Sequence, residues 1–392
     1  MLRRLLLAGL ILGCAGAHVR PCRAQADRYE LGRRVRVCEA AWDKQTDPEA
    51  RKRATEHLKK AVTLFFGFRL PDAGRAMTDA RFALRSAEGP TPIEAWAASL
   101  ELRPSSRLID ATTETLKAEL RPFYKVDGPA PEGARLVVTI GASGKKAADV
   151  AIQGDKWPQE VALDLSGTPE GDHPIRAVVV VGDREQANLV TVVSIVEGLD
   201  ARREALRQTM ANWPEGPTTD RETARALLTL LDKFAEGATL ETDYPLSVLL
   251  KEAEAITAAQ GAGQTYFDRS RTGQHWLTVA LPGGGKAVAR VQVPEEAVKG
   301  TKMPLVLALH GAGGSENLFF DAYGVGAIKR YCAERGWMLV APRSNGMGGG
   351  QTEQLVDELA RVYPIDRKKV LVVGHSMGAM QAVGFEVLKL VA

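Results

Sequence analysis

The sequence predicts an α/β fold for the last third of the chain, preceded by a helical region and a small β-rich region. From about residue 304 onward, short apolar β-branched runs alternate with helical patterns, which is typical of a parallel sheet with right-handed crossovers. Between residues 135 and 195, short strand-like runs are separated by Gly, Asp and Pro turns. Before residue 125 the apolar pattern has the period of helices.

Length and charge limit the classes of function. The chain has 392 residues, of which 45% are hydrophobic, and a net charge of +3. It can therefore bury a substantial core, and its length predicts two or three domains. Its positive and negative charges are interspersed, so we expect binding neither to nucleic acid nor to an anionic membrane.

Residues 1–26 have the features of a signal peptide. Arg3-Arg4 precede the apolar run Leu5–Leu12, and Ala24-Gln25-Ala26 is a small-residue cleavage site. The apolar run is too short to span a bilayer. We expect a secreted or periplasmic protein without a membrane span, and lipoprotein anchoring at Cys14 is the alternative.

Residues 27–130 are predicted to be helical. Asp47, followed by Pro48, is an N-cap that opens a helix running to about Phe66. Thr91 and Glu94 form a capping box that opens another. Aromatic residues recur at helical spacing, which favours core positions over a binding groove: Phe65, Phe66, Phe82 and Trp96.

Residues 131–200 are predicted to form a β-sandwich-like domain. The expected strands cover residues 135–140, 149–153, 160–165, 175–181 and 187–195. They contain mainly Val, Ile, Leu and Ala and few aromatic residues. This composition favours a scaffold or dimerisation module over a module that holds a polymeric substrate.

Residues 201–264 are predicted to be a helical linker region. One amphipathic helix opens near Thr219 and stops at Gly237, and a second runs from Leu246 to Gln260. The final domain is predicted to cover residues 265–392.

The final domain begins with a predicted hairpin. His275–Ala280 and Ala287–Val293 are alternating strands joined by Pro282–Gly285. The glycines lack the spacing of a phosphate-binding P-loop, and Ala287 stands where that motif has Ser or Thr. Next we expect strands at 304–309 and 337–341, with helices at 321–334 and 352–363.

Two motifs indicate nucleophilic chemistry. Gly374-His375-Ser376-Met377-Gly378 lies between a predicted strand, 369–373, and a predicted helix, 379–390. This is the nucleophile elbow G-x-S-x-G, which exposes a serine hydroxyl on a sharp turn, so Ser376 is the candidate nucleophile. The strand 304–309 ends in a glycine-rich loop, where such enzymes place one oxyanion-hole amide. The candidate donors are therefore the backbone N–H groups of Ala312 and Met377, with His310, Gly311 and Gly313 supporting the loop.

Residues from about 273 to 392 resemble the first half of an α/β-hydrolase, and most resemble the secreted esterase and polyhydroxyalkanoate (PHB) depolymerase-like branch. The resemblance lies in Leu309–Gly314, Val340–Arg343 and Tyr363–Asp366, which lead to the elbow. It covers about a third of the chain. It implies cleavage of a small-molecule or polymeric carboxylic ester through an acyl-enzyme, without a cofactor or metal, and leaves the substrate and the oligomeric state open.

The base of the expected triad is missing from this sequence. A serine nucleophile needs a histidine, itself oriented by a carboxylate, and in folds with this elbow both follow the serine. Only sixteen residues follow Ser376, and none is a histidine. None of the upstream histidines is suited to the role: His18, His57, His173, His275, His310 and His375. The triad Asp and His are therefore not present in this chain.

The predicted sheet also lacks the strands that such a fold has beside the elbow strand. The elbow strand would therefore lie at an exposed edge. Three explanations stay open: a truncated or frame-shifted record, a degenerate gene product, or completion by a second chain. We expect an exported serine esterase. The alternatives are a serine peptidase of the prolyl-oligopeptidase type and a catalytically inactive truncated product.

Overall fold

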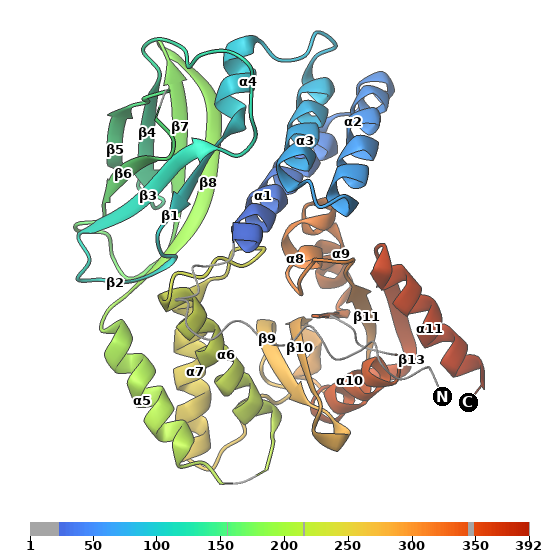
Figure 1. The fold of residues 1–392 in the computed structure, drawn as a ribbon. Coiled ribbons are helices and arrows are strands. Elements are labelled where there is room, and N and C mark those ends of the chain that lie inside the picture. Colours follow the sequence, from blue (N-terminus) through green and yellow to red (C-terminus); the bar gives the residue numbers. More distant parts are fainter. Residues whose placement is uncertain (1–22, 155, 215, 344–348, 392) are drawn as a thin grey trace, which may run out of the picture.

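The computed structural model describes residues 23–154, 156–214, 216–343 and 349–391. It is a mixed α/β structure with a helical N-terminal region and several sheets (Figure 1). Most of the predicted signal peptide lies outside the described residues. Its expected cleavage site, Ala24-Gln25-Ala26, falls in the first turns of helix α1, Arg23–Lys44.

The N-terminal region continues with α2, Pro48–Phe66, α3, Leu70–Arg85, and α4, Pro92–Ser99. Both predicted caps are present: Asp47 accepts hydrogen bonds from the amides of Glu49 and Ala50, and Thr91 forms a capping box with Glu94. The core prediction is confirmed for Phe82 and Trp96, which are buried. It is wrong for Phe66, whose side chain is 59% exposed at the end of α2.

The helical prediction for residues 27–130 is wrong after Ser99, because β1, Leu100–Pro104, β2, Leu108–Asp110, and β3, Thr115–Pro122, are strands. In β3, Leu116, Ala118 and Leu120 are buried and alternate with more exposed residues. This is the period of two that a sheet with one buried face requires. Their pairing partners are distant in the sequence, so tertiary contacts determine that these residues form strands rather than helices.

These strands and five later ones form two sheets. The first has the order β1-β3-β6, and the second β2-β8-β7-β4-β5. The later strands are β4, Arg135–Ile140, β5, Lys145–Ala151, β6, Gln159–Asp164, β7, Gly171–Val181, and β8, Arg184–Val196. Pairing is antiparallel except between β2 and β8. Inward side chains of both sheets, such as Leu120 and Val138, form one hydrophobic core.

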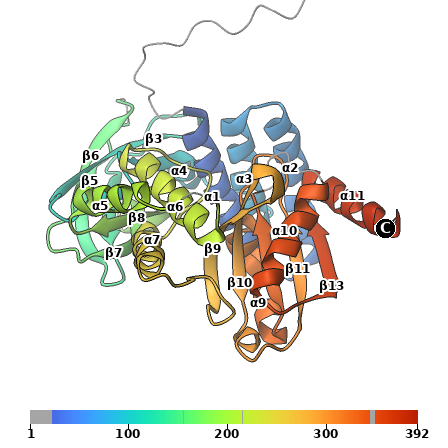
Figure 2. The same cartoon turned by 90° about the horizontal axis from the view of Figure 1, so that it is seen from below.

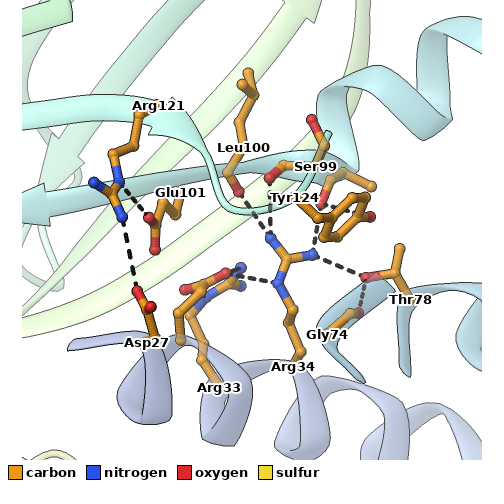
Figure 3. Close-up of polar contacts among 12 residues, drawn as sticks. Asp27, Arg33, Arg34, Gly74, Thr78, Ser99, Leu100, Glu101, Arg121 and Tyr124 are labelled. Carbon is orange, nitrogen blue, oxygen red and sulfur yellow. Dashed lines mark hydrogen bonds and ion pairs between the residues drawn. The ribbon is translucent and has the colours of Figure 1, made fainter. Parts of the chain in front are cut away.

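Helix α1 is attached to the first sheet by buried charged groups (Figure 3). Arg34 donates to Thr78 Oγ1 at 2.8 Å, to the carbonyl of Ala98 at 2.6 Å and to that of Leu100 at 3.1 Å. Its Nε also lies 2.9 Å from a carboxylate oxygen of Glu30. A single side chain of α1 thus contacts α3, the end of α4 and the start of β1.

Helices α5, Leu199–Ala211, α6, Thr219–Ala235, and α7, Leu246–Gly261, follow. The predicted ends of the last two helices agree with the structure within two residues. Leu231 of α6 and Leu249 of α7 belong to the same core as Leu305 and Leu307 of the third sheet. These helices therefore pack as a layer on that sheet.

The third sheet has the order β13-β11-β12-β10-β9. Its strands are β9, Gly273–Ala280, β10, Lys286–Val293, β11, Met303–Leu309, β12, Met338–Pro342, and β13, Ile365–Gly374. β9 and β10 form the predicted hairpin, and β12, β11 and β13 are parallel, as predicted. β10 pairs with β12 in the antiparallel sense.

Helices cover both faces of this sheet. Leu305 and Leu307 of β11 share a core with α6, α7 and Leu355 of α10, Gly349–Val362. Val306 and Ala308 point to the other face and pack with Phe320 of α8, Leu318–Asp321, and with α9, Ala327–Arg335. The last helix, α11, Met377–Val391, contacts α10 and β13 (Figure 2).

The helix predicted for residues 321–334 is confirmed only from Ala327, where α9 begins. Residues 323–326 instead form a short 3₁₀ segment, η3, Tyr323–Gly326, in which Gly324, Val325 and Gly326 have φ of 58°, 54° and 68°. Three successive left-handed residues are incompatible with a continuous right-handed helix.

Strand β13 is an edge strand in the described part of the chain, as predicted, because it pairs there with β11 alone. Leu371 on this strand is 52% exposed, and Met380 on α11 is 77% exposed. Within the described ranges, no helix is both long and apolar enough to cross a membrane.

Candidate active site

Ser376 lies on the sharp turn that the motif predicts. β13 ends at Gly374, α11 begins at Met377, and Ser376 between them is exposed and has φ of 55°. A non-glycine residue in the left-handed region is uncommon and strained, and such residues concentrate at functional sites. The serine stands at the N-terminal end of α11, where backbone N–H groups carry partial positive charge.

The two outer glycines of the motif are required by close backbone contacts. A methyl group built on Gly374 would lie 2.3 Å from the carbonyl oxygen of Gly378. One built on Gly378 would lie 2.0 Å from the carbonyl oxygen of Leu309. Any side chain at either position would therefore displace the turn that exposes Ser376.

The glycine-rich loop after β11 lies beside this turn. Leu309 pairs with Gly374 at the carboxyl ends of the two parallel strands, and the amide of His375 donates to the carbonyl of Leu309 at 3.0 Å. A methyl group on Gly311 would lie 3.1 Å from Ser376 Cβ. The structure thus brings together the loop and the serine, which are about 65 residues apart in the sequence.

Some backbone amides of the glycine-rich loop and of the serine turn are engaged in local hydrogen bonds. Gly314 N–H donates to the carbonyl of Gly311 at 3.2 Å, and Gly378 N–H donates to that of His375 at 2.9 Å. Among the described residues, the amides of Ala312 and Met377 donate to no backbone carbonyl.

His310 is buried in the loop, with 1% of its surface exposed. Its Nδ1–H donates to the carbonyl of Gly311 at 2.8 Å. Burial lowers the pKa of the imidazole, which is therefore neutral at pH 7. The hydrogen bond holds the imidazole against its own loop.

Buried polar side chains that the motifs did not reveal bind Glu316 and Asn317, which follow the glycine-rich loop. Glu316 accepts hydrogen bonds from Tyr244 at 2.9 Å and from Arg343 Nε at 2.7 Å. Asn317 accepts from Trp276 Nε1 at 3.0 Å and donates to Thr242 at 2.9 Å. The loop is thereby fixed by side chains from distant segments, as a preorganised site requires.

The two histidines near the serine make contacts with other groups. The ring of His375 packs against Tyr323, with centroids 4.7 Å apart, and His310 is bonded within its own loop. His275 lies on β9, at the opposite edge of the sheet, and bonds Glu252 at 2.8 Å.

The remaining histidines lie elsewhere. His173, on β7 in another sheet, bonds the carbonyl of Pro169 at 2.7 Å. His57 lies on α2 and interacts electrostatically with Asp79. His18 lies outside the described residues. In the part of the chain that the structure describes, no group of three or more His, Cys, Asp and Glu side chains is arranged to hold a metal ion.

Comparisons with known proteins give distant similarities. No family model matches the chain, and no curated protein matches it. An S-formylglutathione hydrolase from Staphylococcus aureus aligns at 20% identity over 31% of this chain and 54% of that chain, with a TM-score of 0.27. One from Agrobacterium tumefaciens aligns at 19% identity over 29% and 52%, with a TM-score of 0.24.

A ferric enterobactin esterase from Salmonella typhimurium aligns over 72% of this chain and 70% of that chain, at 11% identity and a TM-score of 0.22. The chain spans about half the length of the two S-formylglutathione hydrolases. These similarities are to hydrolases and esterases, and they are distant.

Proposed function

We propose that the protein is a serine hydrolase that cleaves carboxylic esters through an acyl-enzyme on Ser376. The proposal is carried by one observation: Ser376 is held in a left-handed conformation, exposed at a strand–helix turn, beside the glycine-rich loop. In this proposal the third sheet and its helices are the first half of an α/β-hydrolase. The first and second sheets are a β-sandwich.

The proposed reaction uses the serine oxygen as nucleophile. Ser376 Oγ attacks the acyl carbon, and the carbonyl oxygen becomes an oxyanion. The amides of Ala312 and Met377 would donate to that oxyanion, aided by the N-terminus of α11. The C–O bond to the alcohol then breaks, the alcohol leaves with a proton, and water hydrolyses the acyl-enzyme.

The serine proton must pass to a base for efficient turnover. His375 packs on Tyr323 and His310 is buried, so these contacts favour a second candidate function, an inactive binding protein. Oxyanion-hole donors alone leave residual catalysis over water. Slow ester hydrolysis is therefore compatible with both candidates.

Labelling with a fluorophosphonate probe separates them. We expect the wild-type chain to be labelled on the peptide that contains Ser376, and the Ser376→Ala variant to be unlabelled. Ser270→Ala, a serine in an exposed turn before β9, is the matched control and should label like the wild type. An unlabelled wild type of native circular dichroism would favour the inactive protein. Short-chain esters against peptide substrates then distinguish an esterase from a peptidase.

Export is a separate proposal, supported by the sequence of residues 1–26. Expression with the native N-terminus should give a periplasmic or secreted product whose first residue is Asp27. A cytoplasmic product that retains Met1 would contradict export, and a product acylated at Cys14 would support the lipoprotein alternative.

A further inference from the structure

The N-terminal helices contact the glycine-rich loop beside the candidate nucleophile. A methyl group on Gly313 would lie 3.5 Å from Phe65 Cζ of α2 and 3.9 Å from Arg28 Nη1 of α1. Gly313 is two residues from Gly311, which adjoins Ser376. Figure 1 shows the end of α2 meeting the domain that carries the third sheet.

A second contact involves the segment that packs on His375, the residue before the serine. Helix α1 packs against η3, and the backbone amides of Gly324 and Val325 interact with the carboxylate of Glu39 on α1. In the same segment, Tyr323 packs on the ring of His375, the residue before Ser376. The helices therefore border the candidate site at two points, which fixes their position relative to the nucleophile.

The chemistry of this border is apolar and positively charged. The ring of Phe65 is half-buried and contacts the ring of Phe66, with centroids 5.5 Å apart, and Phe66 is 59% exposed. Arg28 is exposed, and among the described residues it forms no ion pair. Its neighbour Asp27 is bound to Arg103 at 2.6 Å and so does not neutralise it.

We propose that Phe65 and Arg28 form one wall of the substrate site, and that the acyl part of the ester carries an apolar group and a negative charge. This inference rests on the proposed function. The proposal places the carbonyl oxygen of the acyl group at the glycine-rich loop and the rest of that group along the loop, towards the aromatic ring beside Gly313. An aromatic face gives a large apolar contact, and a guanidinium is suited to a carboxylate.

The test compares three nitrophenyl esters: the acetate, the benzoate and the monoanionic glutarate. Phe65→Ala should lower kcat/KM for the benzoate about 10-fold and leave the acetate nearly unchanged, because removing apolar contact affects the larger group. Arg28→Gln should lower kcat/KM for the glutarate about 3- to 5-fold and leave the neutral esters unchanged. Tyr331→Ala and Arg75→Gln, an exposed aromatic and an exposed arginine away from the loop, are the matched controls.

A binding measurement keeps this inference separate from the proposed function. Ligand-observed NMR of the benzoate and glutarate esters with the Ser376→Ala variant reports binding without turnover. The Ser376→Ala variant should bind both esters. Adding Phe65→Ala should abolish binding of the benzoate, and adding Arg28→Gln should abolish binding of the glutarate. This result supports the proposed wall even if the fluorophosphonate probe does not label the wild type. If the wild type is labelled but the two substitutions change kcat/KM equally for all three esters, or for none, the proposed wall is contradicted. The hydrolase proposal is then unaffected.

Discussion

Gly378 and Leu309 are in direct backbone contact. A methyl group on Gly378 would lie 2.0 Å from the carbonyl oxygen of Leu309 and 2.5 Å from its carbonyl carbon. The first turn of α11 therefore rests on the end of β11. Because Ser376 is two residues before Gly378, this contact fixes the position of the serine relative to the end of β11.

Replacing Gly378 by alanine should be strongly destabilising. The atoms that the new methyl group meets are backbone atoms, which cannot rotate away, so we expect a loss of about 3 kcal/mol in the free energy of unfolding. Gly384→Ala in the same helix is the control, because a methyl group there meets nothing within 4 Å. The control should be neutral or gain up to about 1 kcal/mol. Urea unfolding measures both, and equal effects would contradict the contact.

The strain at Ser376 predicts that its replacement by glycine stabilises the protein. Its φ of 55° disfavours a side chain, and glycine adopts this conformation without that penalty. We expect Ser376→Gly to raise the free energy of unfolding by about 1 kcal/mol relative to Ser376→Ala, which keeps the Cβ atom. Both variants should lose fluorophosphonate labelling. Equal stability of the two in urea would show that the turn is unstrained.

The elbow was predictable from the sequence because it is local. A buried strand, two glycines around a serine and a following helix all lie within residues 365–391, and the structure has them. The caps at Asp47 and Thr91 were predictable for the same reason, since each depends on three or four neighbouring residues.

Features that depend on distant residues were not predictable. Strands β1 to β3 pair with segments up to 86 residues away, and their own pattern had been interpreted as helical. The contact of Phe65 with the loop at Gly313 joins segments almost 250 residues apart. Glu316 carried no motif, although Arg343, which binds it, belongs to a segment that resembled the hydrolases.

Arg34 is predicted to be one of the most sensitive residues outside the site. It is 5% exposed, and Arg34→Met would leave Glu30 and three carbonyl groups without this donor. Removing one partner of a buried ion pair costs about 3–5 kcal/mol. Arg361→Met removes an exposed pair with Glu358 and should cost less than about 1 kcal/mol. Chemical unfolding of both variants tests this, and a similar small loss in each would mean that Arg34 is dispensable.

Glu39, at the contact between α1 and η3, should make the stability of the protein depend on pH. Burial raises the pKa of its carboxyl group to about 7, although the backbone amides of Gly324 and Val325 favour the charged form. In the unfolded chain the pKa is near 4.5. The folded state therefore binds the proton more tightly, so this group's contribution to stability is fully present below about pH 4.5 and is lost as the pH rises towards 7.

Glu39→Gln should remove this dependence, because the amide stays neutral and still offers an oxygen to the two backbone amides. We expect the variant to match the wild type at pH 4.5 and to be more stable by about 1 kcal/mol at pH 8, a value reduced for the partial exposure of the group. Thermal unfolding across this pH range measures the difference, with Glu88→Gln, an exposed glutamate, as the control. A constant difference between variant and wild type from pH 4.5 to 8 would mean that Glu39 stays charged in the folded protein. In that case the two backbone amides, rather than burial, would determine its protonation.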